Sequence, residues 1–181
     1  MGLALVPGFP STLEWLNAPA PASVAERGWL TAVAFINIGS AWSLQTLHEL
    51  QALRARFPGR LRAFALHVPR FDHERDPRRV VKRMHRHGLR LPLALDADWV
   101  AWQQWGVRMW PTVVLLDGEG HVVARVEGDG GQPSAFGDRR GRRCVLPFQR
   151  RRKPRHQCQT HGQPPPVLRA TTAARRSLRR F

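Results

Sequence analysis

The sequence predicts an α/β fold, in which a mixed central sheet is flanked by helices and followed by a disordered basic tail. Apolar runs of strand length alternate with amphipathic runs of helical length, and a tight turn joins the last two strand-like runs. A sharp change in composition after residue 130 predicts the tail. We therefore expect an irregular N-terminal segment over 1–28, an α/β domain over 29–130, and an Arg- and Pro-rich tail over 131–181.

The periodicity of apolar residues predicts the order of the elements. Leu30 to Ile38 is a nearly continuous apolar run, as expected for a strand that is covered on both faces. From Ser43 the apolar residues follow the period of a helix, which Pro58-Gly59 ends. The remaining expected elements are a strand at 61–68, a helix capped by Asp76 with Val80, Val81 and Met84 facing inward, a strand at 91–95, a helix capped by Asp98, and hairpin strands at 112–116 and 121–126.

Five short stretches of this pattern carry a resemblance to a known family. They are Glu14-Trp15-Leu16-Asn17; Leu47-His48-Glu49-Leu50; His67-Val68-Pro69-Arg70-Phe71 with Glu74; Leu91-Pro92-Leu93-Ala94-Leu95-Asp96 with Asp98 and Trp102; and Gly106-Val107-Arg108 with Trp110-Pro111-Thr112, Leu116-Asp117 and Gly120. In this order, over roughly residues 9–130, the chain resembles the thioredoxin-like (redoxin, TlpA-type) domain of NHL-repeat proteins and related bacterial thiol proteins. The resemblance implies a thioredoxin-like fold from a thiol–disulfide redox family.

The redox motif of that family is degenerate in this chain. Redox-active members have Cys-x-x-Cys at the start of the helix after the first strand, and the matching residues here are Ser43-Leu44-Gln45-Thr46. A helix N-terminus lowers the pKa of the first thiol, and the second thiol resolves the mixed disulfide. The hydroxyl groups of Ser43 and Thr46 do neither, so we expect no dithiol exchange and no cysteine-based peroxide reduction there. No catalytic residue is assigned, and the chain is not expected to be an enzyme at this site.

Pro111 is the second landmark that the resemblance supplies. In the family the matching proline is cis, and the residue before it binds extended peptide. The resemblance therefore makes Trp42, Trp110 and Pro111 candidate binding residues of a groove for a protein or peptide. A proline that only shapes the fold, with both tryptophans packed in the core, is the alternative interpretation.

Other classes of function find little support in the sequence. Cys144 and Cys158 are too few for a disulfide framework or a four-cysteine zinc site, and His85 and His87 lie on different sides of a helix. We therefore expect neither a metal site nor a cofactor. No run of eighteen apolar residues is present, and the N-terminus lacks a basic start and a sustained apolar stretch, so we expect a cytoplasmic protein without a membrane segment.

The basic charge is concentrated in the tail. Residues 1–130 hold 15 Lys and Arg and 12 Asp and Glu, whereas 131–181 hold 14 Lys and Arg and one acid, Asp138. One interpretation is a basic arm over 139–180 that binds nucleic acid or an acidic surface. A further hypothesis concerns thiols in the tail. Neighbouring arginines would lower the pKa of Cys144 and Cys158, so these cysteines, or thiols of a partner, would support oxidoreductase or peroxidase-type redoxin activity.

A different explanation of the tail is out-of-frame translation of GC-rich DNA, in which case residues 131–181 are not a selected sequence. The family's last helix, which would follow the hairpin, is then missing. This explanation predicts a domain with one exposed sheet face. The function that the sequence favours is a protein- or peptide-binding module with a thioredoxin-like fold.

Overall fold

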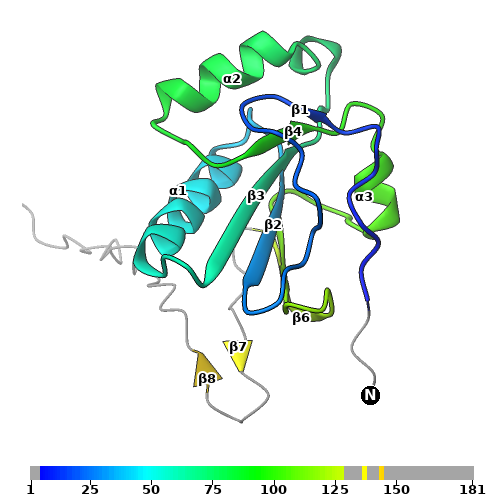
Figure 1. Cartoon of the computed structure of the whole chain (residues 1–181). Coiled ribbons are helices and arrows are strands. Elements are labelled where there is room, and N and C mark those ends of the chain that lie inside the picture. Colours follow the sequence, from blue (N-terminus) through cyan, green and yellow to red (C-terminus); the bar gives the residue numbers. More distant parts are fainter. Residues whose placement is uncertain (1–4, 129–135, 138–142, 145–181) are drawn as a thin grey trace, which may run out of the picture. The chain divides into compact units, whose positions relative to one another are not determined.

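The structure is a computed structural model that describes residues 5–128, 136–137 and 143–144. A six-stranded mixed sheet lies at the centre of this part of the chain (Figure 1). The strand order in this sheet is β1-β4-β3-β2-β5-β6. The elements are β1 (Glu14–Trp15), β2 (Leu30–Ile36), α1 (Ala41–Arg56), β3 (Leu61–His67), a 3₁₀ turn (Asp72–Glu74), α2 (Pro77–Arg86), β4 (Leu93–Leu95), α3 (Val100–Gln104), β5 (Thr112–Leu116) and β6 (Val122–Glu127).

The sheet combines parallel crossovers with an antiparallel hairpin, which confirms the predicted fold class. β2, β3 and β4 run parallel and are connected through α1 and α2. β5 pairs antiparallel with both β2 and β6, and β1 pairs antiparallel with β4. A second sheet has two strands, β7 (Phe136–Gly137) and β8 (Arg143–Cys144).

Helices and the N-terminal segment cover both faces of the central strands. On one face, Ala32, Ala34 and Ile36 of β2 pack with leucines of α1 and with Val80 and Met84 of α2. On the other face, Val33 and Phe35 pack with residues of α3 and of the segment before β2. Figure 1 shows α1 and α3 on opposite sides of the sheet. This two-sided burial explains why the sequence of β2 is apolar at nearly every position.

The expectation of one exposed sheet face is wrong for β2 and β3, whose residues on the α1 face are buried. At the β5–β6 end of the α1 face, Val113, Val123 and Ala124 are half-buried in the described part of the chain. On the same face, residues of β2 and β3 are buried because α1 and α2 pack over them.

The N-terminal segment is part of the same folded unit. The sequence predicts an irregular segment over 1–28, yet β1 forms within it and extends the sheet by pairing with β4. Leu13 and Val24 are buried in the core on the α3 side. None of the helices in the described part of the chain has the length and apolarity that a membrane-spanning helix needs.

The start of α3 differs from the prediction, because Asp96 caps the helix and Asp98 does not. The Asp96 carboxylate accepts hydrogen bonds from the backbone N–H groups of Ala101 (3.2 Å) and Trp102 (2.8 Å). Asp96 is buried directly after β4, whereas Asp98 is exposed and lies 3.5 Å from the guanidinium of Arg75. Trp99 precedes the helix with φ of 62°, a left-handed conformation that is costly for a bulky residue. The two N–H groups bound by Asp96 help to hold this bend.

We expect Asp96→Ala to lower the free energy of unfolding by about 1–3 kcal/mol, since two buried N–H groups lose their acceptor. Urea denaturation followed by circular dichroism measures the change. Asp98→Ala is the matched control and should change the free energy of unfolding by less than about 1 kcal/mol, because it removes only an exposed ion pair. An equal loss in both variants would contradict the assignment of the cap.

Candidate functional site

The residues that follow β2 and precede β5 meet at one edge of the sheet. Ile36 at the end of β2 is paired with His67 at the end of β3, and Phe35 is paired with Thr112 at the start of β5. The start of α1, the exit of β3 and the bend at Trp110-Pro111 therefore lie at the same edge. The candidate residues that the sequence singled out in the folded domain are all at this edge.

Helix α1 begins two residues earlier than predicted, which changes the position of Ser43. The Ser40 side chain caps the helix and accepts a hydrogen bond from the Ser43 N–H (3.4 Å). Ser43 is therefore the third residue of α1, and its side chain is 0% exposed. Its Oγ accepts a hydrogen bond from the Asn37 N–H at 3.2 Å. Thr46, one turn later, is half-buried.

Asn37 and Glu74 form a hydrogen-bonded corner beside Ser43. The Asn37 amide donates from Nδ2 to Oε2 of Glu74 (2.7 Å) and to the Val68 carbonyl (3.2 Å). Its Oδ1 accepts a hydrogen bond from the Gly39 N–H (2.8 Å). A Cβ atom at position 39 would lie 2.9 Å from side-chain oxygens of both Asn37 and Glu74, so any other residue there would displace these hydrogen-bonded groups.

His67 lies under the same corner and is fully buried. Its Nδ1 accepts a hydrogen bond from the Ile38 N–H (3.3 Å), which leaves the proton on Nε2 to donate to the Glu74 carbonyl (3.1 Å). This arrangement is that of a neutral imidazole. Burial lowers the pKa of His67 and outweighs the opposing effects of its hydrogen bonds and of the Glu74 carboxylate.

Glu74 stays ionised through its hydrogen bonds. Burial alone would raise the pKa of its carboxyl group, but hydrogen bonds from Asn37 and from the backbone N–H groups of Arg70 and Phe71 hold that pKa below the usual value. His67 and Glu74 were predicted only as parts of the resemblance, and Asn37 was not predicted. A polar residue at the end of a nearly continuous apolar strand was the available signal.

The two tryptophans of the expected peptide site differ in their surroundings. Trp42, the second residue of α1, is 54% exposed. Trp110 is half-buried, with its ring centroid 5.6 Å from that of Trp99 and 5.0 Å from that of Trp102. The Trp110–Pro111 peptide bond is cis, and Pro111 is buried. Met109, just before them, is 46% exposed.

The remaining candidates of the sequence analysis lie largely outside the described residues. Cys144 is in β8, Cys158 lies outside the described residues, and so does most of the proposed basic arm at 139–180.

One further cluster lies on the β5–β6 turn, where Asp117, Glu119 and His121 approach one another. Its groups hold the turn, because Asp117 Oδ1 accepts hydrogen bonds from the N–H groups of Glu119 (3.0 Å) and His121 (2.9 Å).

Solved structures similar to this chain have thioredoxin-like folds. A thioredoxin-like superfamily protein is 18% identical, with a TM-score of 0.64 over 72% of this chain and 90% of that one. A putative thiol:disulfide interchange protein DsbE from Chlorobium tepidum is 17% identical, with a TM-score of 0.56 over 70% of this chain and 84% of that one. No family model matches the sequence.

Curated relatives are similar over most of this chain. NHL repeat-containing protein 2 from Homo sapiens is 29% identical over 135 residues, which are 72% of this chain and 19% of the human protein. Protein SUPPRESSOR OF QUENCHING 1, chloroplastic, from Arabidopsis thaliana is 28% identical over 127 residues, which are 69% of this chain and 12% of that protein. The chain thus spans less than a fifth of the length of these relatives.

The buried His67 predicts a loss of stability in mild acid. Its folded-state pKa lies below the ordinary 6.5 of an unfolded histidine, so the unfolded chain takes up the proton first as the pH falls. The contribution of His67 is complete above pH 6.5 and is lost below it, by up to about 1.4 kcal/mol per pH unit, until the folded-state pKa is passed. Glu74 does not obscure this range, because its ordinary pKa is 4.5 and its folded-state pKa is lower still.

Urea denaturation of the wild type and of His67→Gln between pH 7.5 and about 5.5 measures this effect. The wild type should lose stability over that range more steeply than His67→Gln. His48→Gln, which replaces an exposed histidine of α1, should retain the wild-type slope. A wild-type slope that persists in His67→Gln would show that another group is responsible.

Proposed function

We propose, from the premise that this chain has a thioredoxin-like fold, that it binds extended segments of other proteins at the edge containing Trp42, Met109 and Pro111. In this proposal the chain carries out no dithiol exchange at Ser43 and Thr46. The observation that carries the proposal is the exposure of two apolar side chains, Trp42 after β2 and Met109 before β5, on segments at the same edge of the sheet. The fold thus presents a contact surface where its redox chemistry would otherwise be.

The residues at the former redox positions support the absence of exchange. Both cysteines of the chain, Cys144 and Cys158, lie far along the sequence from positions 43 and 46. A serine hydroxyl is not ionised near neutral pH and forms no disulfide, so neither the attacking nor the resolving step is available to it. The Ser43 oxygen is in addition buried and hydrogen-bonded to the Asn37 N–H.

The exposed side chains support binding. Large apolar side chains that remain exposed together at a functional edge of a fold are typical of interaction surfaces, and tryptophan is prominent among residues that dominate binding energy. Trp42 lies at the first turn of α1, whose starting geometry is held by the hydrogen bonds of Ser40, Asn37 and Ser43. A side chain on such a fixed helix start loses little conformational freedom on binding.

The comparisons support a role as one module among others. The chain corresponds to less than a fifth of NHL repeat-containing protein 2 and of the Arabidopsis thaliana relative. A domain of this size in a longer protein suits the recruitment of a partner. Which partner is recruited is part of the proposal's test.

A second candidate function is thiol chemistry by Cys144, Cys158 or a partner's thiols. The sequence favours it only through the arginines around these cysteines, which lower a thiol pKa. Binding of nucleic acid or an acidic surface through 139–180 remains a prediction of the same kind. Each is separable from the main proposal by a variant.

We expect no reduction of insulin disulfides by the full-length chain in the presence of dithiothreitol, beyond the rate of dithiothreitol alone. The turbidity of the released insulin B chain measures the reaction. Cys144→Ser/Cys158→Ser is the companion variant. Turnover by the wild type that disappears in this variant would favour the tail cysteines, and turnover that persists in it would contradict the proposal.

We expect Trp42→Ala to weaken the binding of an extended peptide by about tenfold or more, as for a central aromatic contact. The probe is fluorescein-labelled insulin B chain with its thiols blocked by iodoacetamide, and fluorescence anisotropy measures its dissociation constant. Phe57→Ala is the matched control, because Phe57 is an exposed aromatic residue at the other end of α1. Equal weakening by both variants would contradict a site at Trp42.

A further inference from the structure

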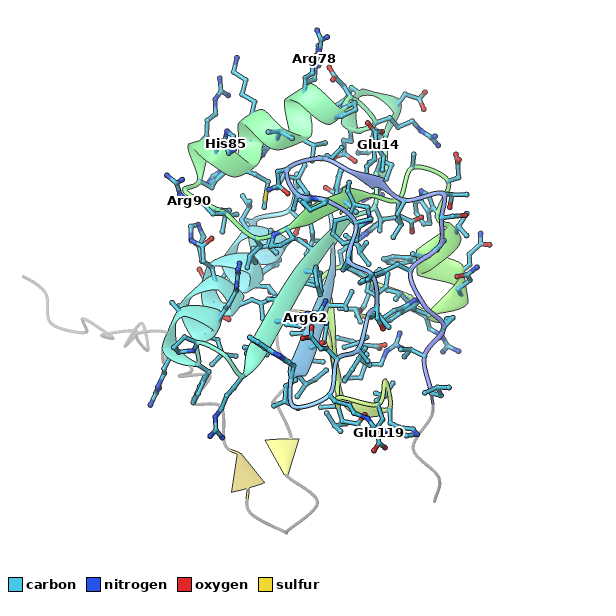
Figure 2. All side chains as sticks on the ribbon, in the orientation of Figure 1. Glu14, Arg62, Arg78, His85, Arg90 and Glu119 are labelled. Atoms are coloured by element: carbon cyan, nitrogen blue, oxygen red, sulfur yellow. The ribbon has the colours of Figure 1, made fainter. Side chains whose placement is uncertain are left out.

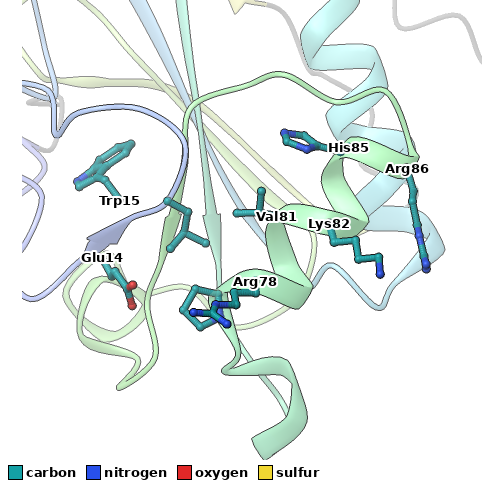
Figure 3. A pocket seen from close by; sticks show the side chains of 9 residues that line it. Glu14, Trp15, Arg78, Val81, Lys82, His85 and Arg86 are labelled. Carbon is teal, nitrogen blue, oxygen red and sulfur yellow. The ribbon is translucent and has the colours of Figure 1, made fainter.

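A groove of about 770 Å³ lies between β1 and α2, at the outer edge of the sheet (Figure 3). The groove is shallow and wide open to solvent, so it suits an extended segment better than a small enclosed ligand. Glu14 and Trp15 of β1 and the following Leu16 line the groove on one side, and residues of α2 line it on the other. This surface involves none of the residues of the edge at Trp42 and Pro111.

The α2 side of the groove is basic. Arg78, Lys82 and Arg86 recur every fourth residue, so they lie along one side of α2, and all three line the groove. His85 lines it as well, and Figure 2 shows Arg78 and His85 projecting from α2. Within the described residues, none of the ion pairs involves Arg78, Lys82 or Arg86, whereas Arg79 is paired with Asp76 (3.3 Å). The groove therefore offers cationic groups that are not neutralised by the fold.

Apolar side chains line the same groove between its charged groups. Val81 was expected to face inward, but it is only half-buried and lines the groove together with Leu16. The occupant should therefore carry apolar side chains as well as negative charge. An inorganic anion alone would leave this apolar surface uncovered.

β1 is the terminal strand of the sheet and offers backbone groups for pairing. Its only neighbour in the sheet is β4. Because the Leu16 N–H donates to the Leu93 carbonyl (2.9 Å), the alternation of a strand turns the backbone groups of Trp15 away from β4. An extended segment that adds to such an edge gains backbone hydrogen bonds, while alternate side chains enter the neighbouring groove.

We propose that the groove between β1 and α2 binds an extended, acidic segment of a partner protein that also carries apolar side chains. The alternative occupants suit the groove less well. A second copy of this chain, or its own Arg-rich 131–181 region, is strongly basic. The ring of Trp15 makes edge-to-face contacts with Phe9 (5.4 Å) and Phe64 (5.7 Å), which restricts the stacking of nucleic-acid bases on it.

Fluorescence anisotropy of labelled eight-residue probes with the full-length chain tests this proposal. The probes are a peptide of alternating Glu and Leu, a peptide of alternating Glu and Ser, and single-stranded dT8. We expect the Glu-Leu peptide to bind at least about tenfold more tightly than the Glu-Ser peptide. Lys82→Glu/Arg86→Glu should weaken the binding of the Glu-Leu peptide by at least about tenfold, because it replaces two attractive charges by two repulsive ones.

Arg83→Glu/Arg90→Glu is the matched control, since it makes the same change in net charge at residues that do not line the groove. It should weaken binding by less than about threefold. Residues 131–181 are identical in all variants, so the difference between the two doubles reports on the groove. Lys82→Gln/Arg86→Gln repeats the comparison if circular dichroism shows that the charge-reversed variant is unfolded.

Three results would overturn the proposal. The first is equal weakening by both double variants, which would show unspecific attraction to a basic chain. The second is tighter binding of dT8 that depends on Lys82 and Arg86, which would assign the groove to nucleic acid. The third is the absence of saturable binding of the Glu-Leu peptide at about 1 mM.

Discussion

The hydrogen bonds of Asn37 hold the corner on which the candidate site is built. Its backbone N–H is bound by Ser43, its side chain reaches Val68 and Glu74, and its Oδ1 accepts the Gly39 N–H. Each of these groups is wholly or partly buried, and an unpaired buried polar group costs about 1–3 kcal/mol. The end of β2, the start of α1 and the exit of β3 are therefore fixed relative to one another, which in turn fixes the place of Trp42 in the first turn of α1.

The two proposed surfaces lie in different parts of one folded unit. The edge at Trp42 depends on the corner of Asn37, whereas the groove at α2 depends on a terminal strand and a basic helix. Nothing in their residues overlaps, so one surface can be altered while the other is kept. A chain with two independent contact surfaces could hold two segments of one partner, and linked binding of that kind strengthens the overall affinity.

The fold could be predicted from the sequence because its apolar runs and turn residues depend on neighbours along the chain. The apolar run of β2 and the turn between β5 and β6 depend on neighbours along the chain, and both were predicted to within two residues. The role of Asp96 as the cap of α3 could not be predicted from neighbouring residues, because it depends on the burial of Asp96 directly after β4 in the folded chain. Likewise, Trp42 and Trp110 look alike in sequence, but only Trp110 meets Trp99 and Trp102 in the folded chain.

The inward position of Ser43 has a consequence for protein engineering. A sulfhydryl group installed at position 43 by substitution would take the place of a hydroxyl that is sealed from solvent beneath the first turn of α1. An incoming disulfide could reach that sulfur only if the groups that cover position 43 moved aside. Converting this scaffold into an oxidoreductase would thus demand a change in the packing around position 43 as well as two cysteines.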